Sequence, residues 1–261
     1  MDIKVKEKSI IDSHAHYYDE RFDDPVRLLK KLNEEMGVGA VINCAVDIPS
    51  AKQCVSISDE LDFCHTAAGF HAGDIPDGNI SAHIAELENF IKKNKVVAIG
   101  EIGLDYYWDD SNKDRQLIFF EEQLKLAYRL NLPVIVHDRD AHNDTLTLLK
   151  KYTPTGVVHC FSGSVEMARE IIKLGMYIGI GGVVTFKNAK RVCEVVRDVP
   201  MEKILLETDA PYMAPEPMRG KTCHSGYIAY TAQKIAEIKG MDTQSVIDIA
   251  ANNTRELFGL K

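Results

Sequence analysis

Eight short apolar segments, rich in β-branched residues, recur along the chain and constrain its fold more than any other feature. They cover residues 10–16, 40–46, 63–70, 96–104, 133–138, 155–161, 177–182 and 204–209. Consecutive segments begin about 22 to 37 residues apart, which is roughly the size of one strand–helix unit. Stretches with helical periodicity lie between them, so the sequence predicts parallel strands joined by crossover helices.

The helical stretches carry recognisable ends. In residues 23–37, Asp24 suits a helix cap, Pro25 suits the first turn, and Gly37 suits the position where the helix stops. Further amphipathic stretches cover 113–131, 164–175, 188–199 and 227–240. A final helix is expected near 242–260, packed back on the body of the protein.

Five of the eight predicted strands end in imidazole or carboxylate groups. These groups are His14, His16, Glu101, His137, His159 and Asp209. A single histidine at a strand end is usually structural, but borderline divalent metals bind these groups, which here recur at one structural position. His14 and His16 are two residues apart, so both imidazoles face the same way on a strand. The pattern predicts a metal site.

We predict a closed (β/α)₈ barrel, or TIM barrel, with an open doubly wound sheet as the alternative. Groups from the first, fourth, fifth, sixth and eighth strands converge only if the eighth strand lies beside the first. Active sites of such barrels lie at the C-terminal ends of the strands, where these groups fall. Because no linker rich in Pro, Gly or Ser interrupts the chain, residues 1–261 are expected to form a single domain.

The candidate ligands divide between two metal positions. His14, His16 and Asp209 come from adjacent strands of a closed barrel and can hold one ion. His137 and His159 can hold a second, and the Glu101 carboxylate can bridge both. Two ions of this kind activate a shared water, whose proton Asp209 can take as general base, so Asp209 and Glu101 are the predicted catalytic residues. By donor chemistry, the set suits Zn²⁺, Mn²⁺, Fe²⁺ or Co²⁺ better than Mg²⁺.

Three further acidic residues lie near these groups. Glu207 is expected to point inward on the same strand face as Asp209, either supporting a ligand or as a polar residue inside the barrel. Asp12 is expected to be structural, and Asp105 to orient ligands or cap a loop. Cys160 is expected to face away from the barrel axis, as a core residue.

The motifs that carry these residues together resemble the TatD family, in the family's order. They are DSHAH at 12–16, GEIGLDYY at 100–107, HDRDAHNDTL at 137–146, HCFSGS at 159–164, TFKNAK at 185–190, ETDAP at 207–211 and RGK at 219–221. The resemblance covers nearly the whole chain. It implies a metal-dependent deoxyribonuclease on an amidohydrolase-type TIM barrel, usually described as magnesium-dependent, with the six residues above as metal ligands.

Several residues are expected to contact the substrate. The resemblance implies a phosphate contact for His71. Arg139, on a strand-to-helix loop, can pair with a phosphate oxygen. Ser162 and Gly163, just before a predicted helix, can offer a hydroxyl and backbone N–H groups to an anion. Lys187, Arg219 and Lys221 are expected on late loops over the barrel mouth, as an anion-binding cluster. The chain departs from the family at Ala72 after His71, and at 222–226 after RGK, and both departures are expected to border the substrate.

The expected substrate is single-stranded DNA or a frayed DNA end, trimmed as by a 3′–5′ exonuclease. Aromatic residues on the loops after the first and fourth strands, available to stack on unpaired bases, are Tyr17, Tyr18, Phe22, Tyr106, Tyr107 and Trp108. A net charge of −8 argues against a long duplex footprint. Alternatives are an amidohydrolase or deaminase acting on a small cyclic amide or nucleobase, and a metal-carrying protein without catalysis.

Composition fits a cytoplasmic enzyme without a membrane span or an obligate protein partner. The chain is 45% hydrophobic and 27% charged, and its N-terminus lacks the long apolar stretch of a signal peptide. Its six cysteines form no CxxC pair and are expected to be reduced thiols. The amide alternative is weakened because many bimetallic enzymes of that kind use a modified lysine on the fourth strand, where this chain has Glu101.

Overall fold

The computed structural model describes residues 3–108 and 111–261. Its eight strands form one sheet in sequence order, and the neighbouring strands run parallel. They are β1 Ile10–Ala15, β2 Val38–Cys44, β3 Cys64–Ala68, β4 Val96–Asp105, β5 Val134–Arg139, β6 Gly156–Val158, β7 Tyr177–Ile180 and β8 Ile204–Leu206.

The sheet closes on itself just beyond the end of β8. Ala15 forms a parallel bridge with Ala210. The backbone N–H of His16 donates to the Ala210 carbonyl at 2.7 Å, and that of Asp209 donates to the His14 carbonyl at 3.0 Å. These contacts place β8 beside β1. The predicted (β/α)₈ barrel is therefore confirmed, and the open-sheet alternative is wrong.

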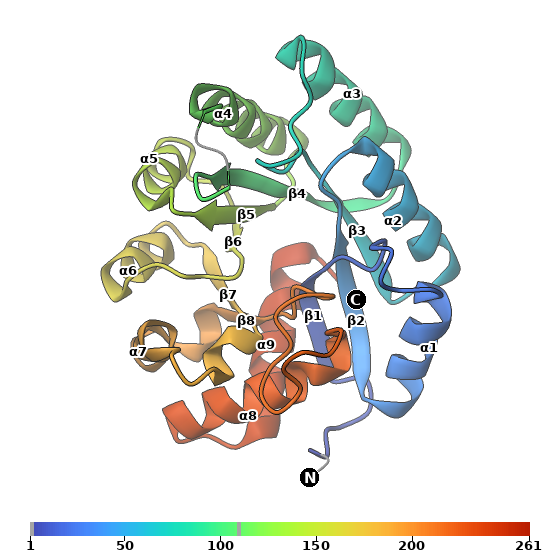
Figure 1. The fold of residues 1–261 in the computed structure, drawn as a ribbon, viewed down its shortest axis with the longest axis vertical. Coiled ribbons are helices and arrows are strands. Elements are labelled where there is room, and N and C mark those ends of the chain that lie inside the picture. The colour runs from blue at the N-terminus through green and yellow to red at the C-terminus, as the bar shows by residue number, and fades with distance from the viewer. Residues whose placement is uncertain (1–2, 109–110) are drawn as a thin grey trace.

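Helices alternate with the strands and surround the barrel (Figure 1). They are α1 Pro25–Glu35, α2 Ile48–Glu60, α3 Ile80–Lys93, α4 Lys113–Leu130, α5 His142–Tyr152, α6 Val165–Lys173, α7 Lys190–Asp198, α8 Ile228–Lys239 and α9 Thr243–Phe258. Short 3₁₀ turns cover Gly182–Thr185, Met201–Lys203 and Ser225–Tyr227. Within the described ranges, no helix combines the length and the apolar character needed to span a bilayer.

The ends of α1 follow the sequence prediction. The Asp24 side chain accepts the backbone N–H of Arg27, and Pro25 occupies the first turn. Gly37 follows the helix with φ +72°, a left-handed conformation that glycine adopts without steric cost. A Cβ there would lie 2.6 Å from the Val5 side chain and 2.8 Å from the Lys6 carbonyl oxygen, so the chain leaves no room for a side chain.

The hydrophobic core has two layers, one between the barrel and its helices and one inside the barrel. Inward residues such as Ile42, Ile135 and Leu205 fill the interior. Leu257 and Phe258 of α9 join the same cluster, so the last helix packs back on the body of the protein, as predicted, and does so at the N-terminal end of the barrel. The opposite end stays open to carry polar groups.

Candidate metal centre

The ends of β1 and β8 bring three of the predicted ligands together. His14 and His16 flank Ala15, and Asp209 precedes Ala210, the bridge partner of Ala15. The Nε2 atoms of His14 and His16 lie 3.0 Å apart. Asp209 Oδ1 lies 3.7 Å from the first of these atoms and 3.3 Å from the second.

A second group forms at the ends of β5 and β6. Val136 pairs with Val158, so the next residues, His137 and His159, lie side by side. Nδ1 of His137 is 3.3 Å from Nε2 of His159. The His159 ring also stacks on His14 at 3.9 Å, which joins the two groups into one cluster.

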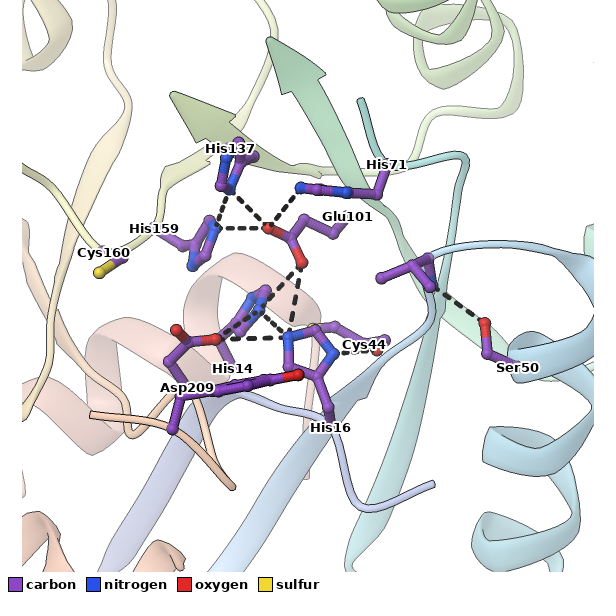
Figure 2. A network of polar contacts seen from close by, with 12 residues as sticks. His14, His16, Cys44, Ser50, His71, Glu101, His137, His159, Cys160 and Asp209 are labelled. Atoms are coloured by element: carbon purple, nitrogen blue, oxygen red, sulfur yellow. Dashed lines mark hydrogen bonds and ion pairs between the residues drawn. The ribbon is translucent and has the colours of Figure 1, made fainter. Parts of the chain in front are cut away.

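Glu101, on β4, reaches both groups with one carboxylate (Figure 2). Its Oε2 lies 3.4 Å from Nε2 of His14 and 3.5 Å from Nε2 of His16. Its Oε1 lies 2.9 Å from Nδ1 of His137 and 2.7 Å from Nε2 of His159. The structure thus brings together all six predicted ligands, with Glu101 between the two positions.

The donor spacing fits divalent ions. Tetrahedral zinc with bonds of about 2.0–2.1 Å places its ligand atoms about 3.4 Å apart. The measured separations in the His14, His16, Glu101 and Asp209 group run from 3.0 to 3.7 Å. Among the described residues, His14 forms candidate metal-holding groups both with His16 and Asp209 and with Glu101 and His159.

The charges in the cluster favour binding of a metal ion, which would displace the protons that the histidines carry. Burial lowers the pKa of His14 to about 4, which leaves this imidazole neutral, the form that binds metals. Burial opposes charge on His16 and His137, but the surrounding carboxylates raise their pKa values to about 9 and about 10. The pKa of Glu101 falls well below its usual range despite burial, because five histidines face its carboxylate, namely His14, His16, His71, His137 and His159.

Neighbouring acids hold the cluster in place. Asp105 Oδ2 lies 3.0 Å from Nε2 of His137 and so turns Nδ1 toward Glu101. Glu207 is buried and accepts the backbone N–H of Cys160, next to His159, and burial raises the pKa of this carboxyl well above its usual range. Asp12 accepts hydrogen bonds from Thr208 and Ser225, at 2.6 and 2.7 Å, in keeping with a structural role.

The cluster lies at the floor of a pocket of about 1020 Å³ at the barrel mouth. His71, Arg139 and Ser162, three of the residues for which substrate contacts are predicted, line this pocket. Nε2 of His71 is 3.8 Å from Glu101 Oε1, and its Nδ1 is 3.0 Å from Asp74.

Comparison with known proteins identifies this arrangement. The family model described as TatD related DNase matches residues 11–259. The chain belongs to the TatD family. It is 39% identical over 252 residues to the uncharacterized metal-dependent hydrolase YabD of Bacillus subtilis, covering 95% of this chain and 98% of that protein.

Two Escherichia coli proteins are also similar to this TatD-family chain. The uncharacterized metal-dependent hydrolase YcfH is 33% identical over 95% of both chains. The crystal structure of the TatD homolog YjjV superposes with a TM-score of 0.91, at 32% identity, over 98% of this chain and all of that one. The chain is therefore a metal-dependent hydrolase of the TatD family.

Other sequence predictions for this TatD-family pocket need correction. Tyr17 is buried, bonds to Ser225 and stacks on buried Phe22, so both rings pack the loop. Tyr106 instead bonds to Asp144 through its hydroxyl. Tyr18 and Trp108 do line the pocket, and Tyr107 packs edge to face against Trp108.

The predicted cationic cluster lies elsewhere. The described residues that line the pocket do not include Lys187, Arg219 or Lys221. Arg219 stacks on Phe186 at 3.9 Å, while Lys221 approaches the sulfur of Met218. Gly163 is also not among the described residues that line the pocket, and a Cβ there would lie 2.7 Å from the side chains of Phe161 and Met167. The sequence reasoning missed Arg191, Tyr212 and Met213, which do line the pocket.

Two further predictions fail for local reasons. Cys160 was expected in the core, but it lines the pocket with its sulfur pointing away from the histidines (Figure 2). β6 ends at Val158 and Cys160 has φ +43°, so strand alternation no longer applies there. The departures from the family pattern, at Ala72 and at 222–226, are not among the described residues that line the pocket. Ala72 is buried, and Ser225 bonds to Asp12 and Tyr17.

Proposed function

We propose that this protein is a deoxyribonuclease that hydrolyses phosphodiester bonds at single-stranded or frayed DNA ends, trimming from the 3′ end. The observation that carries the proposal is the Glu101 carboxylate, shared between two groups of imidazoles on the floor of an open pocket. Such a set of residues would hold two divalent ions, which would supply Lewis-acid chemistry at this place.

The residues have separable roles in this proposal. When bound, the ions would polarise a phosphoryl oxygen and lower the pKa of a water. Asp209 turns Oδ1 toward His14 and His16, which leaves Oδ2 to accept a proton from the attacking water. Asp105 holds the His137 ring through Nε2.

The pocket supports a short anionic substrate. Arg139 and Arg191 line its wall and supply positive charge, while Ser162 offers a hydroxyl. The chain as a whole carries a net charge of −8, which disfavours a long duplex contact. An intact duplex also cannot bring its backbone to the floor of the pocket as easily as a loose end.

The amide-hydrolysing alternative has less support. Strand β4, Val96–Asp105, presents Glu101 to the cluster and contains no lysine that could become a bridging ligand. The six cysteines are free, and four of them are buried, which supports a reducing compartment such as the cytoplasm for the proposed reaction.

The test uses 5′-labelled single strands, frayed duplexes, closed circular duplex and a panel of small amides, each with Mg²⁺, Mn²⁺, Zn²⁺, Co²⁺ or Fe²⁺. We expect a ladder that shortens the labelled strand one nucleotide at a time, as for trimming from the 3′ end. Amide hydrolysis without nuclease activity, internal cuts in the closed circle, or no DNA cleavage with any metal would contradict the proposal.

A further inference from the structure

Exposed apolar side chains gather at the mouth of the pocket. In the described part of the chain, the large hydrophobic residues that are exposed are Tyr107, Trp108, Ile118, Tyr128, Tyr212 and Met213. Trp108, Tyr212 and Met213 line the pocket, and Tyr107 packs edge to face on Trp108 at 4.9 Å. Scattered exposed apolar residues are ordinary, but a group of them around one pocket marks a binding surface.

The first group, here called the first platform, consists of Tyr107, Trp108 and Arg139. The Arg139 guanidinium lies 4.1 Å from the Tyr107 ring centre and 5.2 Å from that of Trp108. The Trp108 side chain remains 74% exposed, so a large part of its surface is free to receive another flat group. Arg139 is the last residue of β5, two positions after the cluster residue His137.

The second platform consists of Tyr212 and Arg21. The guanidinium of Arg21 lies 4.2 Å from the Tyr212 ring centre and is held by two hydrogen bonds to Asp19, at 2.8 and 2.9 Å. The Tyr212 hydroxyl donates to the same carboxylate at 3.4 Å. The Tyr212 ring lies 6.4 Å from the ring of His16, so this platform adjoins the cluster.

The two platforms lie on opposite sides of the metal cluster. The first follows β4 and β5, whereas the second follows β1 and β8, which close the barrel across from them (Figure 1). Between the platforms, Glu101 connects His16 on the second platform's side with His137 on the first platform's side. A flat group on each platform would therefore have the cluster between them.

We propose that one DNA strand crosses the mouth with an unpaired base on each platform, so that the scissile phosphate lies between two held nucleotides. The inference rests on the proposed function and names the substrate subsites of the same pocket. Base stacking on an aromatic face is sequence-tolerant, because every base has a flat face. A paired duplex cannot offer its bases in this way, so the platforms select unpaired strands.

Trp108 makes the first platform directly observable, because it is the only tryptophan in the chain. The probe is a series of phosphorothioate oligothymidines, from the mononucleotide upward, titrated into the metal-loaded protein while tryptophan fluorescence is followed. We expect quenching by the single strands and none by a matched blunt duplex. Affinity should rise sharply at the shortest oligomer that reaches both platforms.

The second platform is tested by substitution. Tyr212→Ala should keep the tryptophan quenching at saturation but weaken the Kd for the longer oligomers about 5- to 150-fold, the range of one lost base stack. Tyr212→Phe keeps the ring and should regain most of the affinity that Tyr212→Ala loses. Tyr128→Ala, which removes an exposed ring on α4 outside the pocket, is the matched control and should leave the Kd unchanged.

The outcomes separate this inference from the proposed function. Three results would overturn the proposal that bases stack on two platforms, even if the protein cleaves DNA. They are a wild-type Kd in Tyr212→Ala, equal quenching by the duplex and the single strand, and no gain in affinity for oligomers longer than the mononucleotide. The expected binding pattern without cleavage by any metal-loaded sample would instead keep the platforms and refute the nuclease.

Discussion

Asp209 occupies a backbone conformation, φ +59°, that aspartate and asparagine adopt more readily than most residues. Asp209→Asn therefore keeps the backbone and an oxygen near His14 and His16, and removes only the basic carboxylate. If Asp209 is the general base, turnover of an end-labelled strand should fall by a factor of about 10² or more. Circular dichroism should show an unchanged fold.

The control for this prediction is Asp248→Asn, which removes a carboxylate on α9 that pairs with Lys6. Its turnover should equal that of the wild type. Near-normal turnover in Asp209→Asn would rule out the base role and leave Asp209 as a ligand alone.

His224 should make the protein less stable in mild acid. Burial and the nearby Lys31 charge lower its pKa from 6.5 to about 4, so the folded state binds fewer protons than the unfolded state between these pH values. The free energy of unfolding therefore falls as the pH drops from 6.5 toward 4, by up to about 1 kcal/mol per unit from this residue.

Urea unfolding at pH 5, 6 and 7 measures this slope in wild type and His224→Gln. The substitution should reduce the slope, whereas Tyr227→Phe, which keeps the ring packed 3.8 Å from the imidazole, should not. Identical slopes in all three proteins would show that His224 contributes nothing to acid sensitivity.

At the scale of the elements, two glycines that follow helices allow the cost of a left-handed backbone to be compared with the added cost of steric crowding. Gly37 after α1 and Gly240 after α8 have similar φ values, +72° and +67°. A Cβ at Gly240 would meet nothing within 4 Å, whereas one at Gly37 would press on Val5 and Lys6. Gly240→Ala should cost about 1 kcal/mol, and Gly37→Ala at least twice as much. Urea denaturation provides the comparison, and equal losses would contradict the crowding argument.

The strand pattern allowed the meeting of the six candidate ligands to be predicted, because parallel strands all end at the same rim of the barrel. This held even though β6 and β8 stop before His159 and Asp209. The pattern could not predict which of two neighbouring loop residues would face the pocket and which would be buried. Tyr17 and Tyr18 are adjacent, yet Tyr17 is buried against Ser225, 208 positions away, and Tyr18 faces the pocket. Tyr212 was missed because its importance arises from contacts with Arg21 and His16.

For the whole molecule, metal loading should stabilise the fold. An ion present at about 100 times its Kd adds about 2.7 kcal/mol to the free energy of unfolding. For a chain of this size, that corresponds to a rise in Tm of about 5 to 10 °C. Differential scanning fluorimetry before and after chelation, and again after adding back each metal, measures the change. The same Tm in every state would contradict the prediction.

Elemental analysis of the same samples should find two ions per chain. Because Glu101 faces both groups, Glu101→Gln should weaken binding at both positions together, whereas the surface variant Tyr128→Ala should retain the full content. Loss of only one ion in Glu101→Gln would show that the carboxylate serves a single position.

The packing of α9 across the base of the barrel has a consequence for turnover. Leu257 and Phe258 pack with Ile42, Ile135 and Leu205 at the end opposite the cluster, so in the described part of the chain apolar side chains fill the barrel below the pocket. Whatever reacts at Glu101 must arrive and depart through the same opening. In the proposed reaction, the released nucleotide therefore stands in the way of the next strand end, and the enzyme would be subject to competitive product inhibition.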